Sequence, residues 1–289
     1  MSEFVHGDNL SHKEAEYMND RKKSGLLKEI RKQYNKWKKA NMTLVGPFAK
    51  PSESDHAVIE ERVRLLNEYK DFIDCQKYAE AFDSRGALFS SVLEEFILYL
   101  FKDMTLSLSP NALIGKAKAY KDTFFKADSF SEMMEKPNVH IEKKDHDFVI
   151  GINIEAKFKS VGSENEQTET LEVPVVAIEC KTYLDKTMLE AVDTAATQLL
   201  KMNPNSIYIV VAERLKLSED VNLKKYKINQ YYILRKQINT DRKDRFKPDY
   251  DFKPIYTDVV EHLFNMVRIH LTSEWHSSKE EGLARGYLL

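Results

Sequence analysis

The stretch Val173–Lys181, Val-Pro-Val-Val-Ala-Ile-Glu-Cys-Lys, determines how the rest of the chain is interpreted. Apart from Pro174, its leading residues are aliphatic, which is typical of a strand that is covered on both faces. Because side chains alternate along a strand, Glu179 and Lys181 project to one face and Cys180 points to the other. A carboxylate and an amine at the end of a buried strand are costly unless they are paired, solvated or bound to a ligand. A structural ion pair and a reactive site are therefore the two interpretations of this pair.

An aspartate upstream supplies the second half of the pattern. Asp147 begins another apolar run, 148–154, and the polar, turn-rich segment 160–170 then returns the chain as a hairpin would. We therefore expect Asp147 to lie near Glu179. An aspartate on one strand followed by Glu-x-Lys on the next is the signature of metal-dependent nucleases that is written PD-(D/E)-x-K. His146 stands where the signature has proline, and we expect its side chain to point to the opposite strand face in a structural role.

Four blocks of sequence extend the likeness beyond this signature. They are Lys-Asp-His-Asp-Phe-Val-Ile-Gly at 144–151, Val-Pro-Val-Val-Ala-Ile-Glu-Cys-Lys-Thr-Tyr-Leu at 173–184, Val-Val-Ala-Glu-Arg-Leu-Lys-Leu at 210–217 and Tyr-Ile-Leu-Arg-Lys-Gln at 232–237. With these blocks the chain resembles the subunits of BbvCI-type restriction endonucleases. Those are Type II enzymes, several of them heterodimeric, that cut short sites built around a CTNAG-like core. The resemblance runs with gaps from Ser84 to Arg285, and the residues before it match only loosely.

The expected fold is α/β, with a mixed central sheet flanked by helices in a restriction-endonuclease-like core and an N-terminal helical region. We expect residues 1–83 to form that helical region, which either clasps DNA or packs on the core, and residues 84–289 to form the nuclease core. A helix at 186–202 between two buried strands implies a right-handed crossover and a parallel pair. We further expect disorder over 1–12, helices at 13–41, 54–82, 88–102 and 255–275, strands at 113–125, 206–212 and 230–235, a basic loop suited to a groove at 237–254, and a mobile tail.

The chemistry that this site would carry is phosphodiester hydrolysis. The carboxylates of Asp147 and Glu179 and the main-chain carbonyl of Cys180 make a hard oxygen site that suits Mg²⁺. Lys181 would orient the attacking water and help to deprotonate it, beside a metal that acidifies that water. The resemblance implies in-line attack that leaves a 5′-phosphate and a 3′-hydroxyl, with either one or two metal ions.

A glutamate from the helix at 88–102 is a further candidate for the site. Members of the family place a glutamate from such a helix beside the metal. Glu94 and Glu95 both flank the apolar stripe of this helix, and we choose Glu94 for the catalytic role. The alternative is an ordinary pair of glutamates that face solvent.

Four residues are our candidates for DNA contacts. Lys116, Lys118 and Tyr120 alternate with small apolar residues on the strand expected at 113–125, and Lys186 begins the helix after the site. Lysine amines can contact phosphate, and a tyrosine can form hydrogen bonds or stack on a base. The alternative for the strand residues is the exposed face of an edge strand.

Composition limits the remaining possibilities. The chain has 289 residues, 31% of them charged, and a net charge of −2. No apolar run approaches the roughly 18 residues of a membrane span, no signal peptide is evident, and the two cysteines lack C-x-x-C spacing, so we expect a reduced, cytoplasmic protein without a membrane partner. Nine Lys and Arg against two acids at 20–39, and ten against four at 215–247, can attract phosphates locally. Zinc-protease, phosphate-loop and serine-hydrolase motifs are missing from the sequence.

The expected partners follow from the expected reaction. One site cuts one strand, so cleavage of double-stranded DNA requires a homodimer or a heterodimer with a related subunit, in a restriction-modification system with a cognate DNA methyltransferase. A structure-specific repair nuclease of the same fold is one alternative. A non-catalytic DNA-binding or specificity subunit is another, although such a module has no need of Asp147, Glu179 and Lys181 together. An α/β domain for protein interaction is the third.

Overall fold

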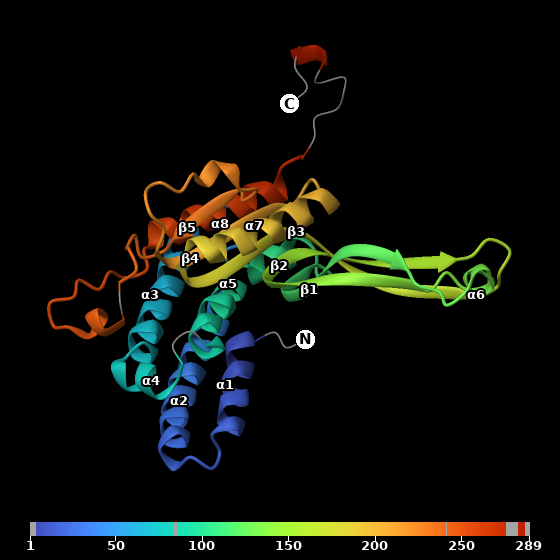
Figure 1. The fold of residues 1–289 in the computed structure, drawn as a ribbon. Coiled ribbons are helices and arrows are strands. Elements are labelled where there is room, and N and C mark those ends of the chain that lie inside the picture. The colour runs from blue at the N-terminus through green and yellow to red at the C-terminus, as the bar shows by residue number, and fades with distance from the viewer. Residues whose placement is uncertain (1–3, 84–85, 241, 276–282, 287–289) are drawn as a thin grey trace.

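The structure, a computed structural model, describes residues 4–83, 86–240, 242–275 and 283–286. Within these residues, a mixed sheet of five strands lies at the centre, and the strands follow one another across it in chain order (Figure 1). The first three strands are antiparallel, and the third, fourth and fifth run parallel. They are β1 Leu113–Phe125, β2 Val139–Lys159, β3 Glu166–Leu184, β4 Ile207–Leu215 and β5 Gln230–Ile233.

Helices cover both faces of this sheet. On one face α5 (Ala87–Leu108) and α8 (Thr257–Thr272) pack on alternate apolar residues of the strands in one continuous core. On the other face lies α7 (Lys186–Met202), whose residues Leu189 and Val192 are buried in a second core. β3 and β4 run parallel and α7 connects them, which confirms the predicted parallel pair. The predicted mixed sheet with flanking helices is also confirmed.

The N-terminal region is helical, as expected, but it begins earlier than the sequence suggested. Disorder over 1–12 is wrong from Val5 onward, since His6 and Leu10 are fully buried. The helix expected at 13–41 is in fact two, because Asp20 ends the connection between them and caps the second by accepting hydrogen bonds from two main-chain N–H groups. The described helices of this region are α1 Val5–Glu16, α2 Arg21–Thr43, α3 Asp55–Ile73 and α4 Gln76–Ala81. The single helix expected at 54–82 is therefore wrong, because the extended backbone at Cys75 separates α3 from α4.

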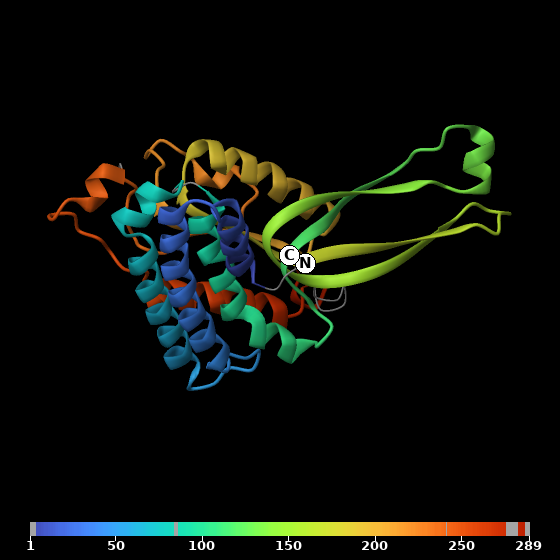
Figure 2. The ribbon, with the colours of Figure 1, turned by 90° about the horizontal axis from the view of Figure 1, so that it is seen from below.

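A long β arm projects from the body of the molecule (Figures 1 and 2). The first half of β2 pairs with β1 and its second half with β3, and β2 bends back near Gly151, where the register shifts. A Cβ at Gly151 would lie 2.2 Å from the carbonyl oxygen of Val173, so the close approach of the strands requires glycine there. At the tip, Ser160 donates a hydrogen bond to Met133 O of α6 (Phe130–Glu135) at 2.7 Å. The hairpin strands are therefore longer than expected, since residues 166–170 of the expected turn belong to β3. The strand expected at 113–125 matches β1, and the one expected at 230–235 ends at Ile233.

The remaining expectations concern the C-terminal part. The segment 237–254 is largely irregular, with a short 3₁₀ turn at Arg242–Phe246. The expected tail falls mostly on residues 276–282 and 287–289, which lie outside the described residues. Among the helices that are described, none combines the length and the apolar character that a membrane span requires. The division at residue 83 stays a prediction.

Candidate active site

Three charged side chains from β2 and β3 meet at one place. Phe148 of β2 pairs with Ile178 of β3 in the antiparallel ladder, so the adjacent residues Asp147 and Glu179 lie side by side. The ammonium of Lys181 donates to Asp147 Oδ2 at 3.2 Å and to Glu179 Oε1 at 2.6 Å. The structure thus brings together the three residues of the signature, and Asp147 lies near Glu179, as the hairpin pattern predicted.

The main chain of β3 holds the aspartate in place. The N–H of Cys180 donates a hydrogen bond to Asp147 Oδ2 at 2.9 Å, so one carboxylate oxygen receives both this bond and the one from Lys181. The Cys180 side chain is buried in the core on the α5 face, as strand alternation predicted. The rotamer of Asp147 is therefore fixed by the strand that carries its partners.

Tyr208 reaches the site from β4 and was not among the residues expected there. Its hydroxyl donates to Glu179 Oε2 at 3.3 Å, and Nδ1 of His146 lies 3.3 Å from the same hydroxyl. His146 is buried, which lowers the pKa of its imidazole to about 4, so it is neutral at physiological pH. The ring of His146 therefore reaches the same cluster through Tyr208, and the expectation that it points to the opposite strand face is wrong. The available signal was a tyrosine within an otherwise aliphatic buried strand, since a buried hydroxyl needs a partner.

Glu94 of α5 lies at the edge of the same cluster. Its carboxylate accepts a hydrogen bond from Lys116 Nζ of β1 at 3.4 Å. Burial, and then the nearby charge of Asp147, raise the pKa of Glu94 to about 7. The alternative of a solvent-facing glutamate pair is wrong, because Glu94 and Glu95 are 8% and 0% exposed.

Glu95 serves a different purpose from its neighbour. Residues adjacent in a helix point about 100° apart, so Glu95 is directed toward the N-terminal helices instead of the sheet. It accepts hydrogen bonds from the main-chain N–H groups of His6 and Gly7 at 2.9 and 3.1 Å and from the hydroxyl of Tyr99 at 2.7 Å. Glu95 therefore fastens α1 to α5.

The balance of charge at the site favours an additional cation. Burial alone would lower the pKa of Lys181, but the charges of Asp147 and Glu179 raise it above its usual value. Burial and the charge of Asp147 also raise the pKa of Glu179. Three carboxylates, counting Glu94, thus face the ammonium groups of Lys181 and Lys116. A further positive charge would let all three carboxylates ionise more readily.

The donor atoms expected at this site suit a divalent metal ion. In the part of the chain that the structure describes, no group of three or more His, Cys, Asp or Glu side chains is arranged to hold a metal ion. The expected ligands are instead two carboxylates and the carbonyl of Cys180, a hard oxygen set of the kind that binds Mg²⁺. Asp147 and Glu179 already share one cation, the ammonium of Lys181, which marks a place where positive charge is stabilised.

The candidates for DNA contacts occupy different surroundings. Lys116 is engaged with Glu94, as described above, and so belongs to the cluster. Lys118 is exposed on β1, and the hydroxyl of Tyr120 lies 2.9 Å from Oγ1 of Thr123. Lys186 is exposed at the first residue of α7. The DNA contacts of these four residues stay predictions.

A mixed sheet that presents an aspartate and a Glu-x-Lys pair beside a helix-borne glutamate defines a restriction-endonuclease-like nuclease fold. A model of the Bpu10I restriction endonuclease family matches residues 87–288, most of the chain. The chain therefore belongs to the Bpu10I restriction endonuclease family and is a Type II site-specific deoxyribonuclease subunit. The family resemblance seen in the sequence is thereby confirmed.

A solved structure supports the fold independently. The chain is similar to a chain of the native BbvCI A2B2 tetramer determined at low resolution, with a TM-score of 0.68 and 19% sequence identity. The similarity covers 95% of this chain and 98% of that chain, so it includes the N-terminal helices as well as the sheet. A comparison with curated proteins found no match.

Proposed function

We propose that this chain is a catalytic subunit that hydrolyses one DNA strand at Asp147, Glu179 and Lys181. The observation that carries the proposal is the shared contact of Lys181 Nζ with both carboxylates, at 3.2 and 2.6 Å. The three side chains come from two strands, β2 and β3, and meet at one point. A subunit that only bound DNA would not need this arrangement. A Mg²⁺ ion held by Asp147, Glu179 and the carbonyl of Cys180 would supply Lewis acidity to the phosphate and to a water.

The residues of the chain position the reactants. A water oxygen forms a bond to phosphorus and gives up a proton, while the bond from phosphorus to O3′ breaks and O3′ takes up a proton. The products are a 5′-phosphate and a 3′-hydroxyl. The raised pKa of Lys181 keeps it an ammonium, so we assign it to hold the water and the phosphate by hydrogen bonds and leave proton removal to another group. Tyr208 orients Glu179, and Glu94 supports the site from α5.

Cleavage of a duplex requires a second site, and therefore a second subunit. The structural neighbour is an A2B2 tetramer, which motivates an assembly of more than one subunit here, with either an identical or a related partner. We propose double-stranded DNA with a short CTNAG-like site as the substrate, and a cytoplasmic restriction-modification system with a cognate methyltransferase as the setting.

The test is digestion of a mapped plasmid by the purified chain with Mg²⁺, alone and with a candidate partner subunit. We expect nicking by the single chain, or cuts at fixed positions by the assembly, and no cleavage after chelation of the metal. Asp147→Asn should abolish cleavage. Asp145→Asn is the matched control, because Asp145 is exposed and two residues earlier on β2. Wild-type cleavage by the Asp147 variant would refute the proposed role of that residue.

A further inference from the structure

A cavity of about 440 Å³ lies beyond the carboxyl ends of β3 and β4. Thr182 and Tyr183 of β3, which directly follow Lys181, form one wall. The end of α3, the helix α4 and Phe246 of the loop after β5 form the others. Among the described residues that line this cavity, none belongs to the candidate active site, so the cavity and the active site are distinct.

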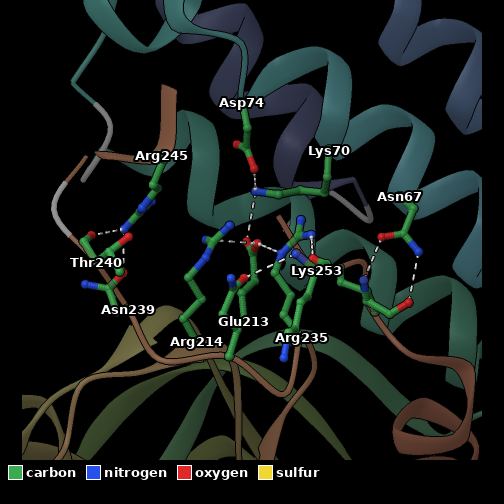
Figure 3. Close-up of polar contacts among 12 residues, drawn as sticks. Asn67, Lys70, Asp74, Glu213, Arg214, Arg235, Asn239, Thr240, Arg245 and Lys253 are labelled. Atoms are coloured by element: carbon green, nitrogen blue, oxygen red, sulfur yellow. Dashed lines mark hydrogen bonds and ion pairs between the residues drawn. The ribbon is translucent and has the colours of Figure 1, made fainter. Parts of the chain in front are cut away.

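Buried charges surround the cavity, and one glutamate lies at their centre. Glu213 forms ion pairs with Lys70 at 2.8 Å, with Arg235 at 3.0 Å and with Arg214 at 3.7 Å (Figure 3). Burial alone would raise the pKa of Glu213, but the three cations hold it well below its usual range. Lys70 also pairs with Asp74 at 3.1 Å. Lys70 and Arg235 hold the shorter contacts to Glu213, and Arg214, at the longest distance, is the least neutralised of the three.

Arg214 and Arg245 bring two guanidinium groups to the cavity. Arg214 is only 3% exposed, and both arginines line the cavity. Among the described residues, the buried Nε of each arginine finds no hydrogen-bond acceptor. Arg245 is anchored on the other side by its bond to Thr240 O at 3.2 Å (Figure 3). Burial, and then the charge of Arg214, lower the pKa of Arg245. An anion between the two guanidinium groups would reduce their repulsion.

Aromatic rings complete the lining. Phe89, Tyr183, Phe246 and Phe252 all contact the cavity. The guanidinium of Arg214 lies over the ring of Phe252, 5.2 Å from its centre. Flat aromatic and guanidinium surfaces of this kind stack on nucleobases, while paired arginines bind phosphate. The cavity therefore combines features for a flat ring and for an anionic group.

We propose that this cavity binds one nucleotide unit, with its phosphate on Arg214 and Arg245 and its base against the aromatic wall. The volume lies within the range of small-ligand pockets. The nucleotide could come from two sources, a free mononucleotide or a nucleotide of bound DNA, and both present the same phosphate and base. Binding here requires no metal ion and no cleavage, so the inference is independent of the proposed catalytic roles.

The cavity contains its own chemical reporter. Cys75 lines the cavity and is exposed, whereas the other cysteine, Cys180, is buried. The rate at which N-ethylmaleimide modifies Cys75 in the wild-type chain therefore reports on occupancy. In metal-free buffer we expect dAMP to slow this reaction, and deoxyadenosine, which lacks the phosphate, to have little effect. Calorimetric titration with dAMP should give a saturable binding curve.

Substitution then tests the arginine. Arg245→Gln should weaken dAMP binding about tenfold or more, the loss expected for a charge-assisted hydrogen bond. Lys247→Gln is the control, because Lys247 is an exposed cation of the same loop and does not line the cavity. If Arg245→Gln disturbs folding, the wild-type Cys75 protection still decides the matter.

A duplex that carries a CTNAG core distinguishes the two sources of the nucleotide. If the source is DNA, the duplex protects Cys75, and Arg245→Gln removes the protection while the variant still binds the duplex. If the source is a free nucleotide, only dAMP protects. Absence of protection and of binding by both probes, or equal binding of deoxyadenosine and dAMP, would overturn the inference.

Discussion

Two buried clusters of charge in this molecule are opposite in composition. Around Glu213, the cations Lys70, Arg214 and Arg235 outnumber the carboxylates of Glu213 and Asp74, and the pKa of Glu213 is lowered. Around Lys181, the carboxylates of Asp147, Glu179 and Glu94 outnumber the nearby amines, and the pKa of Glu94 is raised to about 7. The two clusters lie close to each other at the carboxyl end of β3. Lys181 belongs to the first, and the next residues, Thr182 and Tyr183, line the cavity beside the second.

The difference indicates what each cluster lacks. Buried charges are stable when they are matched, so an excess of one sign marks a place where a ligand of the other sign is stabilised. The cluster at Lys181 has an excess of carboxylates and suits a cation. The cluster at Glu213 has an excess of cations and suits an anion. Removing one carboxylate from each cluster should therefore have opposite effects on stability.

The largest effect is expected at Glu213. Glu213→Gln leaves Arg214 and Arg235 without this carboxylate and leaves Lys70 with Asp74 alone. We expect the free energy of unfolding to fall by about 3–5 kcal/mol, as for other broken buried ion pairs. Urea denaturation at neutral pH measures this loss, with the exposed Glu219→Gln as control. Since the folded-state pKa is lowered, the contribution of Glu213 is present above the usual value of 4.5 and is lost as the pH falls below it. An unchanged midpoint would mean that Glu213 does not balance these cations.

Lys181 tests the other cluster through its activity. Lys181→Ala should slow Mg²⁺-dependent cleavage by about 10²–10³-fold, or about 3–4 kcal/mol, because a preorganised donor at the phosphate is lost. Duplex affinity should change little. Single-turnover cleavage and binding titrations measure the two quantities, and Lys201→Ala at the exposed end of α7 is the control. Cleavage at the wild-type rate would show that the contact with both carboxylates is structural only.

Glu94 provides the stability change of opposite sign. Its pKa rises from 4.5 to about 7 on folding, so the ionised carboxylate opposes folding above that range. In metal-free buffer at about pH 8, Glu94→Gln should raise the free energy of unfolding by about 1–3 kcal/mol. The gain should shrink as the pH falls from 7 and disappear below 4.5, where Glu94 is protonated in both states.

The control for this stability change is Glu190→Gln, since Glu190 is exposed on α7. It should leave the unfolding midpoint unchanged across the same pH range. Destabilisation by Glu94→Gln at the higher pH would mean that Lys116 and Lys181 already balance the glutamate, and the comparison between the two clusters would fail.

The central part of the fold could be predicted because it depends on local pattern. Alternation placed Glu179 and Lys181 on one face, and the turn-rich segment 160–170 brought Asp147 beside them. The bounds of β1 and α7 also follow from periodicity. The sequence did not reveal the length of the β arm, because its outer strands are largely charged and lack the apolar runs that mark a buried strand.

What could not be predicted depends on contacts between distant elements. The choice between Glu94 and Glu95 depends on how α5 is rotated about its axis relative to the sheet. A rotation by one residue, about 100°, would exchange the roles of the two glutamates. The burial of His6 requires Tyr69 and Ser91 from two other helices. The partners Lys70 and Arg235 of Glu213 come from α3 and from the segment after β5. The sequence placed Glu213 in the block 210–217 but could not show that these distant cations surround it.

The smallest expected effect belongs to Tyr208, which contacts the carboxylates through its hydrogen bond to Glu179. Tyr208→Phe removes the donor to Glu179 and keeps the packing, so cleavage should slow about tenfold or less, by roughly 1 kcal/mol. The ionised form of Glu179 loses a stabilising partner, and so its pKa should rise further. The pH at which cleavage reaches half of its maximum should therefore move upward. Tyr231→Phe, on the neighbouring β5, is the control. A slower rate without a shift in the pH profile would assign Tyr208 to packing alone, and the carboxylate excess at Lys181 would then be independent of β4.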